Sequence, residues 1–197
     1  MAADLQPGPD SPPTDELRAA EASLNALQHI VHPLSRDDLT KPTASGDFDV
    51  AQLTEHIVDT ITSVGEALGA DLPPRDPDET VERQLIAVGR PTLDAFHLRH
   101  GLDGSVTWRD TETPVRTLAG LLSFGLLVHA WDYTAATGVR ADVPDSLASY
   151  VMGIAEKIIT PERRANGDFG AAVEPPAKAS AFDKLIAFTG RDPAAAG

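Results

Sequence analysis

The chain has 197 residues, enough for one domain with a real hydrophobic core, and its formal net charge of −14 repels nucleic acid and anionic lipid surfaces. It contains no cysteine, so it has no disulfide, no thiolate metal site and no thiol nucleophile of its own, and any sulfur chemistry needs an external thiol. No stretch approaches the roughly 18 apolar residues that cross a bilayer, so we expect a cytoplasmic protein with neither a membrane nor a nucleic-acid partner.

The first helix is expected behind a short tail. Residues 1–13 are polar and rich in proline, which is typical of a disordered segment, and we expect a single domain over residues 14–193. Apolar residues at helical spacing predict a helix over residues 14–31. Thr14 is the expected N-cap, and Pro33 ends the helix because its nitrogen has no hydrogen to donate.

The second predicted helix begins with a capping pair. The side chain of Asp49 can accept a hydrogen bond from the backbone of Gln52, whose own side chain can bond the backbone of Asp49. The helix is therefore expected to begin at Val50 and to continue to Gly69, a residue that suits a helix end. His56 lies beside the apolar stripe of this helix.

Two further long helices are expected. The first covers about residues 78–99, and Pro91 should kink it by removing a backbone donor. An extended stretch at Ser105–Trp108 follows. Pro114 then begins a helix that continues to Gly138.

The C-terminal part predicts shorter helices over residues 144–158 and 180–188, with loops between them. There is no internal repeat and little strand signal. The whole pattern therefore predicts an all-α protein, a bundle of four main helices with a small C-terminal helical and loop extension.

His56 and His129 are the most informative residues of the chain. His129 lies on the apolar stripe of the helix that Pro114 begins, so imidazoles from two separate helices can meet within one bundle and form a metal site. The alternative is that each is a hydrogen-bonded core residue, as a single histidine on an apolar face more often is. Trp131 is expected in core packing, with the wall of a ligand pocket as its alternative.

Three separated segments carry a family resemblance. They are Asp49–Val58, Leu126–Gly138, and a C-terminal stretch made of Phe169–Val173 and Asp183–Pro193. In this order they resemble the DinB-like metal-binding proteins related to the N-terminal domain of mycothiol-dependent maleylpyruvate isomerase. The resemblance implies a DinB-like four-helix bundle, in agreement with the helical pattern.

The resemblance also implies a metal site. In that family a divalent metal, commonly zinc, is held by a histidine from the second helix and by a carboxylate and a histidine four residues apart on a later helix. His56 and His129 match the two histidines, and Gly125 falls on the carboxylate position. Because glycine has no side chain that can coordinate, the implied site is degraded. Gly125 has two further interpretations: it allows a close approach of a neighbouring helix, or it leaves a pocket beneath His129.

Two aspartates are candidates for the missing role. Asp59 lies three residues after His56, and Asp132 lies three residues after His129, so each shares a helix face with its histidine. The resembling family tends to have glycine at the position of Asp59, so we expect Asp59 to compensate for Gly125 as the third metal ligand. Asp132 matches a usual family residue and is expected to orient His129 without binding the metal.

The function implied by the resemblance is that of a metal- and thiol-dependent isomerase or S-transferase. A divalent metal, zinc above all, would lower the pKa of a thiol such as mycothiol, which adds to a small electrophilic substrate. The alternative is a noncatalytic, metal-free protein on the same bundle, which binds a small molecule or serves in assembly as a homodimer. Bound metal separates these two hypotheses.

Overall fold

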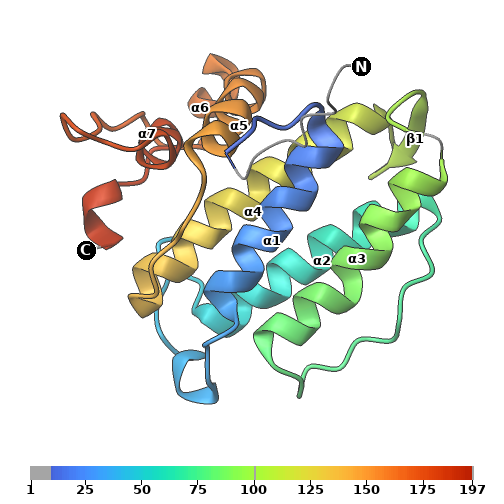
Figure 1. Cartoon of the computed structure of the whole chain (residues 1–197), viewed down its shortest axis with the longest axis horizontal. Helices are drawn as coiled ribbons and strands as arrows, with labels where there is room; N and C mark the ends of the chain where they lie inside the picture. The colour runs from blue at the N-terminus through green and yellow to red at the C-terminus, as the bar shows by residue number, and fades with distance from the viewer. Residues whose placement is uncertain (1–9, 100, 197) are drawn as a thin grey trace, which may run out of the picture.

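The computed structural model describes residues 10–99 and 101–196, in which four long helices close around one core (Figure 1). Each of the four contacts two of the others, α1 with α4 and α3, and α2 with the same two. The helices are α1 (Glu16–Val31), α2 (Val50–Leu68), α3 (Val81–Leu98) and α4 (Val115–Thr137). The predicted all-α class is confirmed, and most of the predicted tail at 1–13 lies outside the described residues.

The ends of α2 and α4 follow the local sequence signals. Asp49 and Gln52 form the predicted reciprocal capping pair at the start of α2. Gly69 and Gly138 end α2 and α4 in the left-handed backbone conformation, with φ values of 78° and 74°. These two glycines are favoured because a Cβ atom would strain that conformation.

Two helix starts differ from the prediction. The N-cap of α1 is Asp15 and not Thr14, because the Asp15 carboxylate accepts a hydrogen bond from the backbone of Arg18 at 2.9 Å. The cap of α3 is Thr80, so this helix begins at Val81 and not at residue 78. In both cases two residues that can cap lie close together, and the backbone geometry selects between them.

A small hairpin and a C-terminal extension complete the fold. Strand β1 (Ser105–Trp108) confirms the predicted extended stretch, and it pairs antiparallel with β2 (Thr111–Pro114), a strand that was not predicted. The extension contains α5 (Asp145–Ile158), the unpredicted short helix α6 (Pro161–Ala165) and α7 (Ala181–Phe188). Two 3₁₀ turns, η1 (Arg36–Asp38) and η2 (Pro193–Ala196), lie in the connection before α2 and at the C-terminal end.

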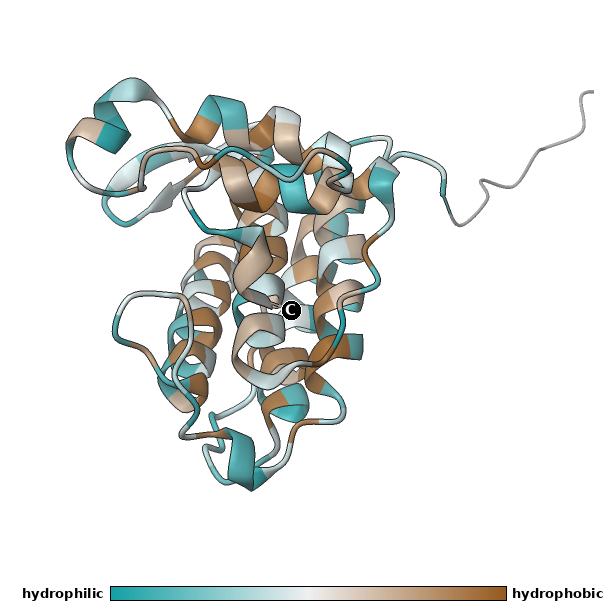
Figure 2. Cartoon of the chain, turned by 90° about the vertical axis from the view of Figure 1, so that its left-hand side faces the viewer, coloured by the Kyte–Doolittle hydropathy of each residue, from teal (hydrophilic) through white to brown (hydrophobic). Residues whose placement is uncertain are grey.

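Helix α4 is buried on two sides. Its inner side contributes to the core shared with α1, α2 and α3, and another side packs in a second apolar cluster with α5 and α7. Figure 2 shows the apolar residues of the long helices gathered on the sides that face one another. A helix that is apolar nearly all round is typical of such a central position.

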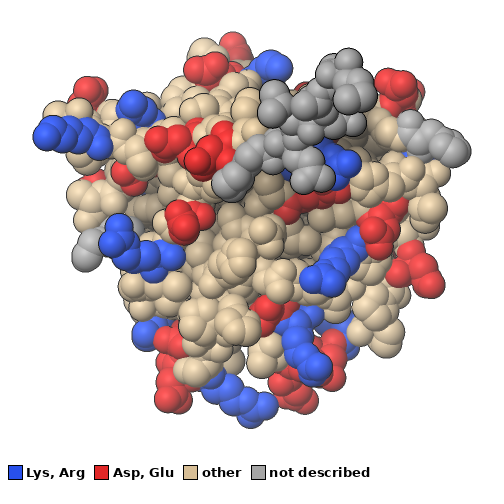
Figure 3. Space-filling model, viewed as in Figure 1, with Lys and Arg blue, Asp and Glu red and all other residues tan. Residues whose placement is uncertain are grey.

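The surface carries the charge. On the face shown in Figure 3 acidic and basic side chains lie interspersed, with uncharged surface between them. Among the residues that the structure describes, none of the helices is both long enough and apolar enough to span a bilayer.

Candidate functional site

The two histidines singled out by the sequence meet between α2 and α4. The ring centroids of His56 and His129 are 5.4 Å apart, and the rings are nearly perpendicular, with an interplanar angle of 84°. His56 is exposed and the His129 side chain is 16 % exposed. The predicted meeting of the rings is therefore confirmed, but it takes place at the surface of the bundle and not in its interior.

A small pocket lies between the two histidines. Its volume is about 50 Å³, room for an ion or a few water molecules and much less than a site that encloses a whole small molecule. It is lined by His56, Ile57, Thr60, Ile61, Leu121, Leu122, Gly125, Leu126 and His129.

Gly125 leaves part of this pocket open. A Cβ atom built at Gly125 would meet no atom within 4 Å, so no neighbouring helix approaches closely there. The close-approach interpretation is therefore wrong. The structure agrees with the other interpretation, in which the absence of a side chain leaves space beside His129.

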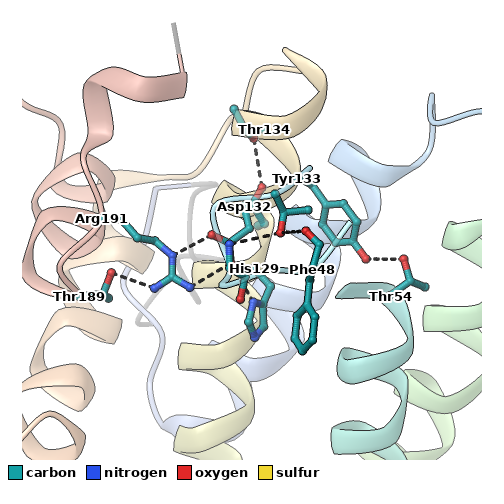
Figure 4. A network of polar contacts seen from close by, with 11 residues as sticks. Phe48, Thr54, His129, Asp132, Tyr133, Thr134, Thr189 and Arg191 are labelled. Atoms are coloured by element: carbon teal, nitrogen blue, oxygen red, sulfur yellow. Dashed lines mark hydrogen bonds and ion pairs between the residues drawn. The ribbon is translucent and has the colours of Figure 1, made fainter. Parts of the chain in front are cut away.

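A buried network of charged groups supports His129 from the opposite side (Figure 4). The Nδ1 atom of His129 lies 2.9 Å from Oδ2 of Asp132, whose side chain is fully buried. Arg191 donates from Nε to Oδ1 of Asp132 at 2.7 Å and from Nη2 to Oδ2 at 3.1 Å. Asp132 thus joins α4 to the segment that follows α7.

The charged groups of this network determine which ring nitrogen of His129 donates a hydrogen bond. Burial by itself would raise the pKa of Asp132, but the hydrogen bond from His129 and the charge of Arg191 lower it, so the carboxylate is ionised. An ionised carboxylate can only accept hydrogen bonds, and Nδ1 of His129 is therefore the donor. In the uncharged form of the ring, Nε2 of His129 therefore carries the lone pair.

The surroundings of His56 keep it uncharged. Partial burial of the ring, then the charges of His129 and Arg109, lower the pKa of His56, against a smaller opposite effect of Asp59. Its imidazole is therefore neutral at neutral pH, as a metal ligand must be. Within the described residues neither nitrogen of His56, nor Nε2 of His129, has a hydrogen-bond partner.

Asp59 does not join the two histidines. Its side chain is 64 % exposed and forms an ion pair with Arg75, whose Nη1 lies 2.9 Å from Oδ1 of Asp59. In the described parts of the chain, residues 10–99 and 101–196, no group of three His, Asp or Glu side chains is placed so that it could hold a metal ion. The expectation that Asp59 supplies the third ligand therefore has no support in the geometry, because Arg75 holds the carboxylate outside the pocket.

Trp131 belongs to the core. It is 3 % exposed and packs in the cluster between α4, α5 and α7, and it is absent from the lining of the histidine pocket. Its expected role in packing is confirmed, and its alternative role as a wall of this pocket is wrong. Trp131 lies two residues after His129, and a separation of two places side chains on different faces of a helix.

Several residues of the site were missed by the sequence analysis. The ring of Phe48 lies 5.6 Å from that of His56. The hydroxyl of Tyr133 lies 2.7 Å from Oγ1 of Thr54 and so connects α4 to α2 beside the histidines. Arg191 lies in a segment that carries the family resemblance, but no local signal pairs it with a residue 59 positions away.

The hairpin reaches the same side of α2. Trp108 donates from Nε1 to Oγ of Ser63 at 2.9 Å, and the guanidinium carbon of Arg109 lies 4.5 Å from the centroid of the Trp108 ring. Ser63 and His56 are seven residues apart and share one face of α2. The hairpin therefore brings a positive charge near His56.

The chain is similar to two mycobacterial proteins over most of its length. No protein-family model matches the chain, and no solved structure matches it. The chain is 28 % identical over 179 residues to two uncharacterized proteins of Mycobacterium tuberculosis, one from strain CDC 1551 and one from strain H37Rv. The similarity covers 90 % of this chain and 98 % of each relative, so it extends over almost the whole fold.

Proposed function

We propose that this chain is a DinB-like protein that binds a divalent metal, with zinc as the preferred ion, through His56 and His129. The observation that carries the proposal is the approach of two imidazoles from different helices to a centroid distance of 5.4 Å. Nε2 of His129, which faces away from Asp132, and both nitrogens of His56 have no hydrogen-bond partner among the described residues. Two such nitrogens beside an open pocket are a donor set that zinc accepts.

The donor set fits a weakly held metal with open coordination positions. Zinc sites in enzymes usually have three protein ligands and one position for water or substrate. Here the position implied for the carboxylate is Gly125, which contributes space instead of a ligand. The pocket of about 50 Å³ then leaves room for ligands from outside the chain, such as water or a thiol.

The residues around the pocket suit thiol chemistry. A bound metal would lower the pKa of a thiol such as mycothiol and so supply a thiolate at neutral pH. Asp132 holds the ring of His129, and the lowered pKa of His56 keeps that imidazole neutral. We therefore propose that the reaction class is isomerisation or S-transfer on a small electrophile.

The first experiment measures bound metal. The chain is purified without a histidine tag, dialysed against zinc and analysed for its metal content. We expect near-stoichiometric zinc in the wild-type protein and its loss in His56→Ala and in His129→Ala. His97→Ala is the matched control, because His97 pairs with Glu21 on the surface and should not affect the metal.

A second variant tests the position of Gly125. Gly125→Glu places a carboxylate one helical turn before His129, and the new Cβ atom meets nothing within 4 Å. We expect its zinc affinity to rise by roughly ten-fold or more, measured in competition with a chromophoric chelator. An affinity equal to that of the wild-type protein would remove Gly125 from the proposed site.

A metal-free binding protein is the second candidate. It is favoured by one observation, that within the described residues no third acidic or histidine side chain is placed to hold a metal ion together with His56 and His129. If the wild-type chain retains no zinc after dialysis and Gly125→Glu does, the bundle has lost its metal and this second function is the better one.

A further inference from the structure

We propose that Arg191 is a positioning residue for His129. Arg191 donates hydrogen bonds to both oxygens of the buried Asp132 carboxylate. It thereby fixes the His129 imidazole in the form that carries its hydrogen on Nδ1 and leaves Nε2 facing the pocket. The C-terminal extension then contributes, through Arg191, a residue that positions a side chain of the site.

Arg191 forms hydrogen bonds with both oxygens of Asp132, and His129 shares one of them. Nε of Arg191 donates to Oδ1 at 2.7 Å. Nη2 of Arg191 donates to Oδ2 at 3.1 Å, and Nδ1 of His129 donates to the same oxygen at 2.9 Å. The planar guanidinium thus sets the plane of the carboxylate, and the carboxylate in turn sets the direction from which Nδ1 of His129 is held.

Arg191 is itself held in place. Its Nη1 atom donates to Oγ1 of Thr189 at 3.3 Å, and its side chain is only 18 % exposed. Thr189 follows α7, and α7 packs on α5. The turn η2, which comes shortly after Arg191 in the sequence, contacts α4. In Figure 4 Arg191 approaches Asp132 from the C-terminal segment, while the ring of His129 lies on the other side of the carboxylate.

Removal of Arg191 should act on His129 through Asp132. The carboxylate is 0 % exposed, so without the guanidinium it is a buried charge that has lost its counter-charge and its anchor. Nδ1 of His129 would then have no fixed acceptor. The two neutral forms of an imidazole are similar in energy when no partner selects one, so hydrogen should appear on Nε2 in part of the molecules.

The test reads the hydrogen position directly. The metal-free protein is labelled with ¹⁵N-histidine, and the nitrogen chemical shifts of His129, assigned with His129→Gln, are recorded at a pH above the titration range of histidine. We expect the Nδ1–H form in the wild-type protein and a mixture of both forms in Arg191→Gln. Arg191→Lys should give an intermediate share of the Nδ1–H form, because lysine keeps the charge but lacks the planar pair of donors that bonds both oxygens.

Controls separate positioning from folding. Arg83→Gln removes another arginine, one that forms an exposed ion pair with Glu79, and should leave the shifts of His129 unchanged. Circular dichroism and thermal unfolding establish which variants are folded, and Arg191→Lys carries the test if Arg191→Gln does not fold. A folded Arg191 variant in which His129 keeps the pure Nδ1–H form would overturn the proposal.

The effect on metal binding rests on the proposed function and is measured separately. Loss of a residue that orients a metal-binding histidine typically lowers metal affinity about 10- to 100-fold, and we expect this for zinc in Arg191→Gln. If the wild-type protein binds no zinc but its His129 shifts respond to Arg191, the proposed metal function fails and the positioning role of Arg191 stands. Unchanged zinc affinity in a folded Arg191→Gln would count against that positioning role.

Discussion

Gly125 weakens helix α4 and leaves open space beside His129. Glycine in the interior of a helix costs about 1 kcal/mol relative to alanine, because its backbone loses more freedom on folding. Nothing in the packing of α4 requires glycine at this point, since a Cβ atom would touch no neighbour. The space beside His129 is the feature of the fold that Gly125 provides.

Gly125→Ala should raise the free energy of unfolding by about 0.5–1 kcal/mol, because alanine favours the helix and meets no atom. The free energy can be measured by urea unfolding. The matched variant is Gly65→Ala in α2, whose Cβ atom would lie 2.5 Å from Oγ1 of Thr92. That variant should be destabilised by about 1–3 kcal/mol. Equal effects of the two substitutions would contradict this account of Gly125.

One hydrogen bond joins α2 and α4, the two helices that carry the histidines. Thr54 on α2 donates its hydroxyl hydrogen to the carbonyl oxygen of Val50 at 2.7 Å. Since Thr54 has no second hydroxyl hydrogen, Tyr133 on α4 is the donor in the 2.7 Å contact between their hydroxyls. Both groups are buried, so the bond sets the position of α2 relative to α4 close to the pocket.

We expect Tyr133→Phe to lower the free energy of unfolding by about 0.5–1.5 kcal/mol. The aromatic ring still fills its place in the core, but the buried hydroxyl oxygen of Thr54 loses its donor. Chemical denaturation gives the difference. Tyr150→Phe is the control, because the Tyr150 hydroxyl makes no hydrogen bond in the part of the chain that the structure describes, and its loss should change stability little. An equally large loss in Tyr150→Phe would show that removal of a tyrosine hydroxyl as such, and not of the bond to Thr54, causes the effect.

For the whole molecule, protonation of carboxyl groups should limit stability in acid. Folding lowers the pKa values of several carboxyl groups through hydrogen bonds and nearby positive charges. The pKa of Asp38, which lies beside Lys41 and Ser35, falls to about 2, and those of Glu82 and Asp132 also lie below their ordinary values. These groups bind protons more weakly in the folded chain than in the unfolded chain. Their contribution to stability is therefore complete above the ordinary pKa and is lost as the pH falls.

The free energy of unfolding should accordingly fall as the pH decreases below about 4.5, the ordinary value of the Glu82 carboxyl. Urea unfolding at a series of pH values measures this dependence. Asp132→Asn should be less stable at neutral pH and should show a shallower decline in acid, because the buried carboxyl no longer takes up a proton on unfolding. A decline as steep in Asp132→Asn as in the wild-type protein would exclude Asp132 as a cause.

The all-α class, the main helices and the meeting of His56 with His129 follow from local patterns in the sequence. Helix ends such as Asp49 with Gln52, or Gly138, depend on residues within one turn of the chain, and these local signals survive folding unchanged. The helical period then places each histidine on a definite face of its helix, and two helices of one bundle bring such faces together.

Which side chains surround the two histidines depends on contacts between residues far apart in the sequence. Asp59 shares a helix with His56, but Arg75, 16 residues later, holds it outside the pocket. Asp132 is paired with Arg191, which is 59 residues distant and comes from the C-terminal extension. Such pairs form because packed elements bring distant charges within reach and exclude the water that would otherwise solvate them, and no local pattern in the sequence records that arrangement.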